Sequence, residues 1–186
     1  MANYILASQS PRRKQLLEWA EIDFEIQQHP TDESYPEGLS PEEVALHIAT
    51  GKAMAVVSEA KGKTVIAADT IVVLGDEIIG KPKDYADAVS ILSKLSGAEH
   101  RVITGVCIAN TFAKKIFADI TTVQFYSLTG EQIEFYVDKY KPYDKAGAYA
   151  IQEWIGVVGI KRIEGDFYNV MGLPVSRVVQ ALQNFS

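Results

Sequence analysis

Cationic side chains occupy the first turn of a predicted helix near the start of the chain. The stretch SQSPRRK begins at Ser8 and follows a short apolar strand, and Ser10 and Pro11 are typical of the cap and first residue of a helix. Arg12 and Arg13 then lie at the positive end of the helix dipole, where acidic residues are ordinarily favoured. The stretch is either a solvated helix face or an anion site, in which backbone N–H groups, arginines and serine hydroxyls hold a phosphate.

Two lysines are further candidates for binding an anion. Lys52 lies on the same face of a predicted helix as the apolar residues Ile48 and Val56. A lysine on such a face either extends to solvent or points into a cleft. Lys81 follows a short apolar strand in the loop sequence GKP, where it is either an ordinary turn lysine or a second cleft cation.

Two carboxylates could supply the opposite charge. Asp69 is predicted to end a buried strand over 64–68, and a carboxylate there is costly unless it is paired or binds a metal. The alternative is an aspartate that forms a turn with nearby backbone. Glu33 stands in a polar loop, where a solvated position is the simple explanation. Together with the cations, the acid pair suggests metal-assisted phosphoryl chemistry.

Other catalytic patterns are missing from the sequence. It holds no His and Cys cluster with zinc-ligand spacing, no G-x-S-x-G nucleophile turn and no P-loop pattern. These observations count against a zinc enzyme, an α/β-hydrolase and a P-loop nucleotidase.

The elements that position these residues alternate between strand and helix and then become mainly strands. The clearest helix start is the sequence SPEE from Ser40, which combines a capping box with proline at the first helical position. This order favours an α/β protein with a mixed sheet. The predicted strands cover 3–8, 22–28, 64–68, 71–74, 77–79, 101–110, 115–126 and 157–163, and the predicted helices cover 11–20, 41–60, 85–95, 130–138 and 174–184.

Composition limits the class of protein. The chain has 186 residues, of which 47% are hydrophobic, so it can bury a substantial core. Its net charge of -6 counts against a general binder of nucleic acid or of an anionic membrane. The single cysteine, Cys107, excludes an internal disulfide and agrees with a reducing cytosol. No apolar segment has the length of a signal peptide core or a membrane helix.

An ordered set of short motifs resembles the Maf family of nucleotide pyrophosphatases. The resemblance spans nearly the whole chain, and the order of the motifs makes it specific although each motif alone is weak. The motifs are Ser8-x-Ser10-Pro11-Arg12-Arg13, Ala68-Asp69-Thr70, Gly80-Lys81-Pro82, Leu95-Ser96-Gly97 with His100, Thr104-Gly105-Val106 and Asn169-Val170-x-Gly172-Leu173-Pro174.

This resemblance implies a fold and an activity. The fold is an elongated mixed sheet flanked by helices, in two lobes with a cleft between them, formed by a single domain over residues 1–186. The implied reaction cleaves a nucleoside triphosphate between its α and β phosphates and yields a monophosphate and pyrophosphate. A divalent cation, Mg²⁺ or Mn²⁺, a cytoplasmic location and a homodimer are also implied, with no nucleic-acid or membrane partner.

The resemblance also assigns roles to individual residues. Asp69 matches the family's proton acceptor, which activates water, and Glu33 and Asp69 hold the metal. The resemblance implies that Lys81 is a catalytic residue, together with Asp69 and Glu33. The expected contacts with the triphosphate come from the cations Arg12, Arg13, Lys52 and Lys81 and from the hydroxyls of Ser8 and Ser10.

A further segment resembles the branch of the family that prefers dTTP and UTP. It runs from Asp144 to Gln152, and in that branch the positions of Arg12, Thr70 and Gln152 are linked to specificity. The amide of Gln152 offers a donor and an acceptor, which can pair with the edge of uracil or thymine. The sequence departs from many relatives after Gln152, because Glu153-Trp154-Ile155 replaces a glycine-rich stretch.

The leading hypothesis is therefore a pyrophosphatase for dTTP and UTP, extending to modified pyrimidine nucleotides. One alternative is the same chemistry on a methylated guanine nucleotide, against which Gln152 and the sequence KAGAY from Lys145 argue. The other is a non-catalytic nucleotide-binding regulator of cell division, which would not need Glu33 and Asp69 beside the cations.

Overall fold

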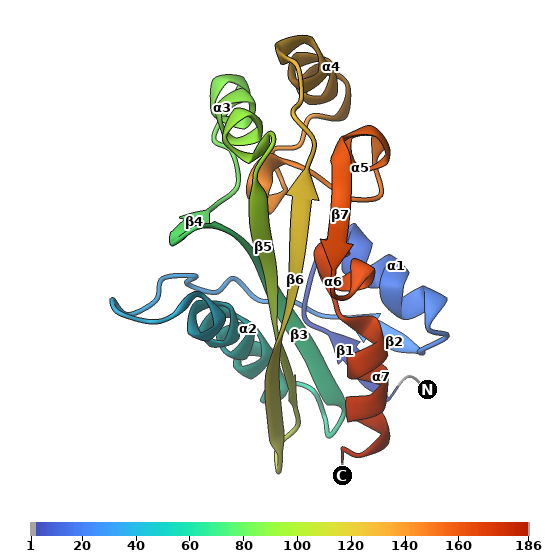
Figure 1. Cartoon of the computed structure of the whole chain (residues 1–186). Coiled ribbons are helices and arrows are strands. Elements are labelled where there is room, and N and C mark those ends of the chain that lie inside the picture. Colours follow the sequence, from blue (N-terminus) through green and yellow to red (C-terminus); the bar gives the residue numbers. More distant parts are fainter. Residues whose placement is uncertain (1–2, 186) are drawn as a thin grey trace. The chain divides into compact units, whose positions relative to one another are not determined.

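The computed structural model describes residues 3–185 and has an α/β architecture (Figure 1). Its strands are β1 (Tyr4–Leu6), β2 (Phe24–Ile26), β3 (Thr64–Leu74), β4 (Glu77–Ile79), β5 (Glu99–Ala109), β6 (Lys114–Phe125) and β7 (Ile160–Glu164). Its helices are α1 (Pro11–Trp19), α2 (Pro41–Val57), α3 (Tyr85–Leu95), α4 (Gly130–Tyr140), a 3₁₀ turn (Ala146–Ala148), α5 (Trp154–Gly159), α6 (Phe167–Met171) and α7 (Val175–Gln183).

The strands form one mixed sheet flanked by helices. Among the described residues it has seven strands, in the order β2-β1-β3-β5-β6-β7, with β4 paired to β3. β1 is parallel to both β2 and β3, whereas β4 is antiparallel to β3 and β7 to β6. This confirms the predicted α/β class and mixed sheet. The cleft between two lobes stays a prediction.

The chain divides into two compact units. Unit 1 comprises the described parts of Met1–Thr70, Thr104–Asp119 and Gly172–Ser186, and unit 2 comprises Ile71–Ile103 and Ile120–Met171. Strands β3, β5 and β6 each contribute residues to both units. The single domain over residues 1–186 stays a prediction.

Strand β3 differs from its prediction. Two strands with Asp69 at the end of the first were expected, but one strand runs without a break from Thr64 to Leu74. The prediction was wrong because it treated Asp69 and Thr70 as residues that must leave the sheet. Their side chains find polar partners beside the strand, so the backbone continues through them. Buried Val72 and Val73 suit such a continuation.

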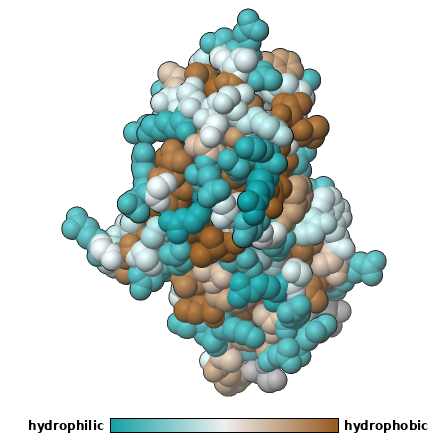
Figure 2. Space-filling view, viewed as in Figure 1, coloured by the Kyte–Doolittle hydropathy of each residue, from teal (hydrophilic) through white to brown (hydrophobic). Residues whose placement is uncertain are grey.

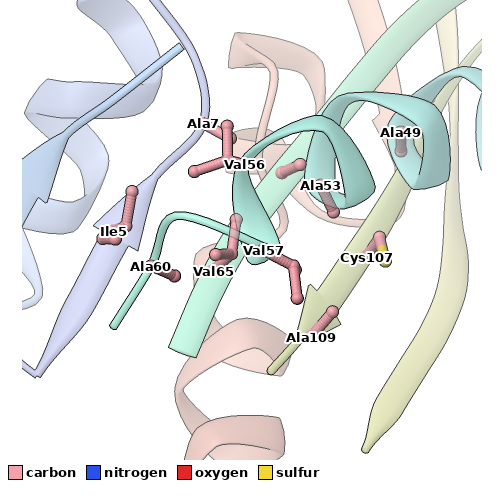
Figure 3. Close-up of a cluster of buried hydrophobic side chains, with 11 residues drawn as sticks. Ile5, Ala7, Ala49, Ala53, Val56, Val57, Ala60, Val65, Cys107 and Ala109 are labelled. Carbon is pink, nitrogen blue, oxygen red and sulfur yellow. The ribbon is translucent and has the colours of Figure 1, made fainter. Parts of the chain in front are cut away.

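Helix α2 packs on the sheet of unit 1 through small side chains (Figure 3). Its start is the predicted capping box, in which Ser40 accepts from the Glu43 amide and Glu43 accepts from the Ser40 amide. A Cβ added at Gly105 of β5 would overlap the backbone carbonyl of Ala45. The helix therefore rests directly on the backbone of β5. The core cluster below it consists of Ile5, Ala7, Ala49, Ala53, Val56, Val57, Ala60, Val65, Ala67, Cys107 and Ala109.

Unit 2 has an aromatic core with one buried histidine. The ring of His100 meets Phe125 and Tyr149 edge-on, with ring centroids 5.3 and 5.5 Å away. Its Nε2 lies 2.8 Å from the Tyr149 hydroxyl, and its Nδ1 is buried. Burial lowers the pKa of His100 to about 4, so the ring is neutral at physiological pH.

Two short helices near the end of unit 2 were not predicted. The expected strand over 157–163 is instead helix α5 followed by β7, and α6 comes after it. Within α5, Gly156 packs so near the carbonyl of Ile151 that a Cβ there would overlap the oxygen. Figure 2 shows hydrophilic and hydrophobic residues interspersed over the visible face. Within residues 3–185, no helix is both long and apolar enough to cross a membrane.

Candidate functional site

The basic first turn of α1 begins as the sequence predicts. Ser10 caps the helix, and its Oγ accepts from the amide of Arg13 at 3.4 Å. The Ser10 amide in turn donates to Oγ of buried Ser8 at 3.2 Å. Both serines thus join β1 to α1 in a fixed turn. Pro11 occupies the first helical position, and Arg12 and Arg13 follow within the first turn.

The side chain of Arg13 is anchored within unit 1. Its Nε donates to the carbonyl of Gly172 at 2.8 Å, Nη1 donates to Oγ of Ser8 at 3.3 Å, and Nη2 donates to Oγ1 of Thr70 at 3.0 Å. These bonds use three of the five donors of a guanidinium. Arg13 is therefore held rigidly, with its charge fixed beside the first turn.

Charges of both signs surround Arg13. Burial lowers the pKa of its guanidinium, whereas the negative charge of Asp69 opposes this, and Arg12 and Glu33 add smaller effects of opposite sign. An arginine stays protonated in spite of such a shift. The charges of Arg12, Glu33 and Asp69 therefore all act on Arg13. They belong to one cluster in unit 1.

Lys52 joins the two carboxylates. Its Nζ lies 2.7 Å from Oδ1 of Asp69 and 2.7 Å from Oε1 of Glu33. The three groups come from α2, from the middle of β3 and from the loop between β2 and α2. The side chains of Lys52 and Asp69 are 16% and 14% exposed, whereas that of Glu33 is 51% exposed. Lys52 thus turns toward the two acids, and its position in a cleft stays a prediction.

Thr104 and Gly172 belong to this cluster, although no role was predicted for them. Oγ1 of Thr70 lies 2.9 Å from Oγ1 of Thr104 and 3.4 Å from the carbonyl of Gly172, which also accepts from Arg13. Both residues stand within the motifs that carry the family resemblance. The motifs were a usable signal, but nothing local indicated which atoms they bring together.

The predicted site residues are divided between the two units. Unit 2 contains Lys81, exposed in the loop after β4, and Gln152, exposed in the turn before α5. The amide of Gly147 donates to the carbonyl of Gly80 at 3.1 Å, which links the chain segments that carry these two residues. Unit 1 contains Ser8, Ser10, Arg12, Arg13, Glu33, Lys52, Asp69 and Thr70.

The carboxylates of unit 1 suit a divalent cation that also binds phosphate. Glu33 and Asp69 place an oxygen each on one ammonium group, so they already converge on a positive charge. Among residues 3–185 no cluster of three or more His, Cys, Asp or Glu side chains is available to hold a metal. Mg²⁺ commonly takes one or two carboxylates and completes its shell with phosphate oxygens and water. The donor set fits that mode of binding and not a closed protein site.

This arrangement favours chemistry on a polyanion. Arg12, Arg13 and Lys52 outnumber the two carboxylates in the cluster, and α1 adds the positive end of its dipole. Buried hydroxyls and a held guanidinium supply directed donors. Such fixed charges stabilise the negative charge that develops during phosphoryl transfer.

Solved structures with a similar fold come from two bacteria. The Ham1 protein of Staphylococcus aureus is 17% identical, with a TM-score of 0.55, and the match covers 97% of each chain. The HAM1 protein of Coxiella burnetii is 13% identical, with a TM-score of 0.51, over 99% of this chain and 100% of that one. At these identities the likeness shows the fold alone.

Relatives much nearer in sequence carry the name dTTP/UTP pyrophosphatase. The protein from Cytophaga hutchinsonii is 50% identical over 179 residues, which are 96% of this chain and 82% of that protein. The one from Porphyromonas gingivalis is 46% identical over 185 residues, which are 97% and 93% of the two chains. The family model described as Maf-like protein matches residues 3–185. The match extends over nearly the whole sequence, and the chain therefore belongs to the Maf family.

Proposed function

We propose that this protein is a nucleoside triphosphate pyrophosphatase that hydrolyses dTTP and UTP to the monophosphate and pyrophosphate. The observation that carries the proposal is the cluster in which Lys52 binds both Glu33 and Asp69 beside the basic first turn of α1. Relatives that are about half-identical over nearly the whole chain are named for this activity. The proposal extends to modified pyrimidine nucleotides.

The cations bind the triphosphate in this proposal. Arg12, Lys52 and Lys81 supply charge, and the amides of the α1 first turn supply donors to phosphate oxygens. Arg13 contributes its charge while it also holds Ser8 and Thr70 in place. The binding energy of these groups positions the α-phosphorus for attack, which is the larger part of catalysis in phosphoryl transfer.

Asp69 accepts the proton of the attacking water. Its side chain is nearly buried and is fixed through Oδ1 by the ammonium of Lys52. A base held in this way needs no reorientation when the substrate binds. Glu33 and Asp69 would hold Mg²⁺ or Mn²⁺, which when bound supplies neutralisation of the phosphate charge.

Base selection rests on Gln152, with Arg12 and Thr70 as further specificity positions. The amide oxygen of Gln152 accepts from the N–H of uracil or thymine, and its amide N–H donates to a carbonyl of the base. A site built on such bonds rejects a base that leaves them unmade. The methylated guanine alternative requires another pairing pattern at this residue.

The test is a panel of nucleoside triphosphates with Mg²⁺ or Mn²⁺, in which pyrophosphate and orthophosphate are measured separately. The expected result is pyrophosphate from dTTP and UTP well above that from purine nucleotides. Pyrophosphate from a methylated guanine nucleotide alone would contradict the assignment of the base. Orthophosphate as the first product would contradict the assignment of the bond, and no turnover with any nucleotide would favour a binding protein.

The proposal includes a homodimer located in the cytoplasm, with no nucleic-acid partner. A protein of this family acting on the free nucleotide pool needs no membrane or polynucleotide contact. Light scattering after size-exclusion chromatography gives the mass directly, and the expected mass is that of two chains. A mass of one chain at micromolar concentration would contradict the dimer and leave the proposed reaction standing.

A further inference from the structure

The turn that carries Gln152 is closed at both ends by the same tyrosine. It consists of residues Ala150 to Glu153, and the amide of Glu153 donates to the carbonyl of Ala150 at 3.1 Å. The amide of Ala150 donates to the hydroxyl of Tyr136 at 3.1 Å, and this hydroxyl donates to Oε2 of Glu153. One phenol oxygen therefore bonds the first and the last residue of the turn.

Tyr136 is well placed to act as a rigid anchor. It lies on α4, is fully buried and stacks on the ring of Tyr140 with centroids 4.9 Å apart. Helix α4 itself begins with a capping box formed by Thr129 and Gln132. A buried tyrosine on a capped helix has few alternative rotamers, so its hydroxyl is fixed in position.

Glu153 is held by a second partner. Its Oε1 lies 3.7 Å from Nζ of Lys145, while its Oε2 accepts from Tyr136. The side chain is 22% exposed, so its charge is partly shielded from water. This residue opens the stretch in which the sequence departs from the glycine-rich pattern of relatives. The departure thus supplies a bonded carboxylate where glycine would offer none.

The backbone beyond the turn is equally constrained. Gly156 lies so near the carbonyl of Ile151 that a Cβ there would overlap its oxygen, and its amide donates to the carbonyl of Glu153 at 2.9 Å. Hydrogen bonds thus hold the turn at Ala150 and Glu153, and backbone packing at Gly156 holds the segment that follows it. Gln152 is the exposed residue within this otherwise bonded segment.

We propose that Tyr136 and Glu153 are positioning residues that hold the turn Ala150–Glu153 so that the Gln152 amide is aligned for the pyrimidine base. This rests on the proposed function, in which Gln152 reads the base. Selectivity through a two-bond pairing depends on the direction of the amide, because a misdirected amide makes neither bond well. Neither residue contacts substrate; both act through Gln152.

The test compares Tyr136→Phe with the control Tyr140→Phe, which removes a phenol oxygen one helical turn away. The quantity measured is the ratio of kcat/KM for UTP to kcat/KM for GTP. Loss of one buried hydrogen-bonding group is expected to lower this ratio about tenfold in Tyr136→Phe, mainly through KM for UTP. Tyr140→Phe should keep the ratio within about twofold, which is the scatter for a substitution outside the network.

A second pair of variants separates positioning from folding. Glu153→Gln retains an acceptor for the Tyr136 hydroxyl and should retain the ratio, whereas Glu153→Leu removes it and should behave as Tyr136→Phe does. Hydrogen exchange at the amide of Ala150 should accelerate in Tyr136→Phe at neutral pH. If Tyr136→Phe does not fold, the UTP-to-GTP ratios of the two Glu153 variants test the positioning role instead.

The reference variant is Gln152→Ala. A ratio lowered in Gln152→Ala but unchanged in Tyr136→Phe and Glu153→Leu would overturn the positioning proposal and leave the proposed function intact. A ratio unchanged in Gln152→Ala itself would overturn the base-reading role and the positioning proposal with it. If the unaltered protein releases no pyrophosphate, the proposed function itself is contradicted.

Discussion

Each unit of this protein contains a lysine that faces two carboxylates, and the two arrangements differ in what surrounds them. In unit 1, Lys52 meets Glu33 and Asp69, both at 2.7 Å. In unit 2, Lys145 meets Asp144 at 2.7 Å and Glu153 at 3.7 Å. One lysine and two carboxylates have the same formal charge in both units, so these three groups alone do not distinguish the two arrangements.

The neighbours of the carboxylates make the distinction. Glu153 also accepts from a buried tyrosine, and Asp144 is the chain neighbour of Lys145, so this cluster is completed by its own segment and α4. The carboxylates of unit 1 come from distant parts of the chain, and their charges act on Arg13, as does that of Arg12. An excess of cations that converge on an acid pair favours an anionic ligand. We therefore infer that the cluster of unit 1 serves chemistry and that of unit 2 serves alignment.

The largest expected difference concerns the aspartates. Asp69→Asn should lower turnover of UTP by about 10³-fold, because the amide cannot accept the proton of water. Thermal melting should show that the variant is folded. Asp144→Asn, the corresponding change in unit 2, should leave turnover within about threefold, since its carboxylate is an exposed ion-pair partner. Comparable losses of turnover in both variants would show that the two carboxylate clusters do not differ in their role in catalysis.

The glutamates should differ in their effect on metal dependence. Glu33→Gln is expected to raise the Mn²⁺ concentration for half-maximal pyrophosphate release by at least about tenfold. Glu153→Gln in unit 2 should leave this concentration unchanged. Removal of metal with a chelator should stop turnover without altering the melting temperature. An identical Mn²⁺ requirement in Glu33→Gln would remove Glu33 from the metal site.

Unit 2 should account for part of the loss of stability in acid. The unfolded chain takes up a proton on His100 below pH 6.5, whereas the folded protein does so only near pH 4. Stability is therefore lost as pH falls through this window, by about 2 kcal/mol between pH 7 and pH 5. His100→Gln should flatten this dependence in chemical denaturation, and the exposed His47→Gln should keep it. An unchanged pH dependence in His100→Gln would show that folding does not change the pKa of His100.

The smallest expected effect is that of the second lysine on stability. Lys145→Met should lower the free energy of unfolding by about 1 kcal/mol, because Glu153 loses its nearby cation while it keeps the tyrosine bond. Turnover should stay within about threefold. Lys94→Met is the control, since its pair with Glu77 is exposed and worth less than about 0.5 kcal/mol. A large catalytic defect in Lys145→Met would assign both lysines to the reaction.

Local signals predicted the elements better than the contacts between them. Caps at Ser10, Ser40 and Thr129 are set by interactions within four residues, and each helix begins where its cap predicts. The break expected at Asp69 was wrong, because the partner that permits a carboxylate in mid-strand is Lys52, far away in sequence. Helix α5 was also missed, and the close approach of Gly156 to the carbonyl of Ile151 within it is not visible in the pattern of residue types.

The candidate site shows a similar division. The sequence indicated which residues carry charge, and the resemblance gave them roles. It did not indicate that Glu33, in a loop without regular structure, would share one ammonium with Asp69. Nor did it show that two N–H groups of the Arg13 guanidinium donate hydrogen bonds to Ser8 and Thr70. Such pairings arise from tertiary packing, which spacing along a chain does not encode.

Because the side chains that pack between α2 and the sheet are small, a substitution in this region more often adds volume than removes it. Six of the eleven residues in that core cluster are alanine, and the helix touches β5 directly at Gly105. Most substitutions of alanine or glycine add volume, and overpacking of a close-packed core is destabilising. Random mutation of this interface would therefore push α2, and with it Lys52, away from the sheet far more often than it would leave a hole.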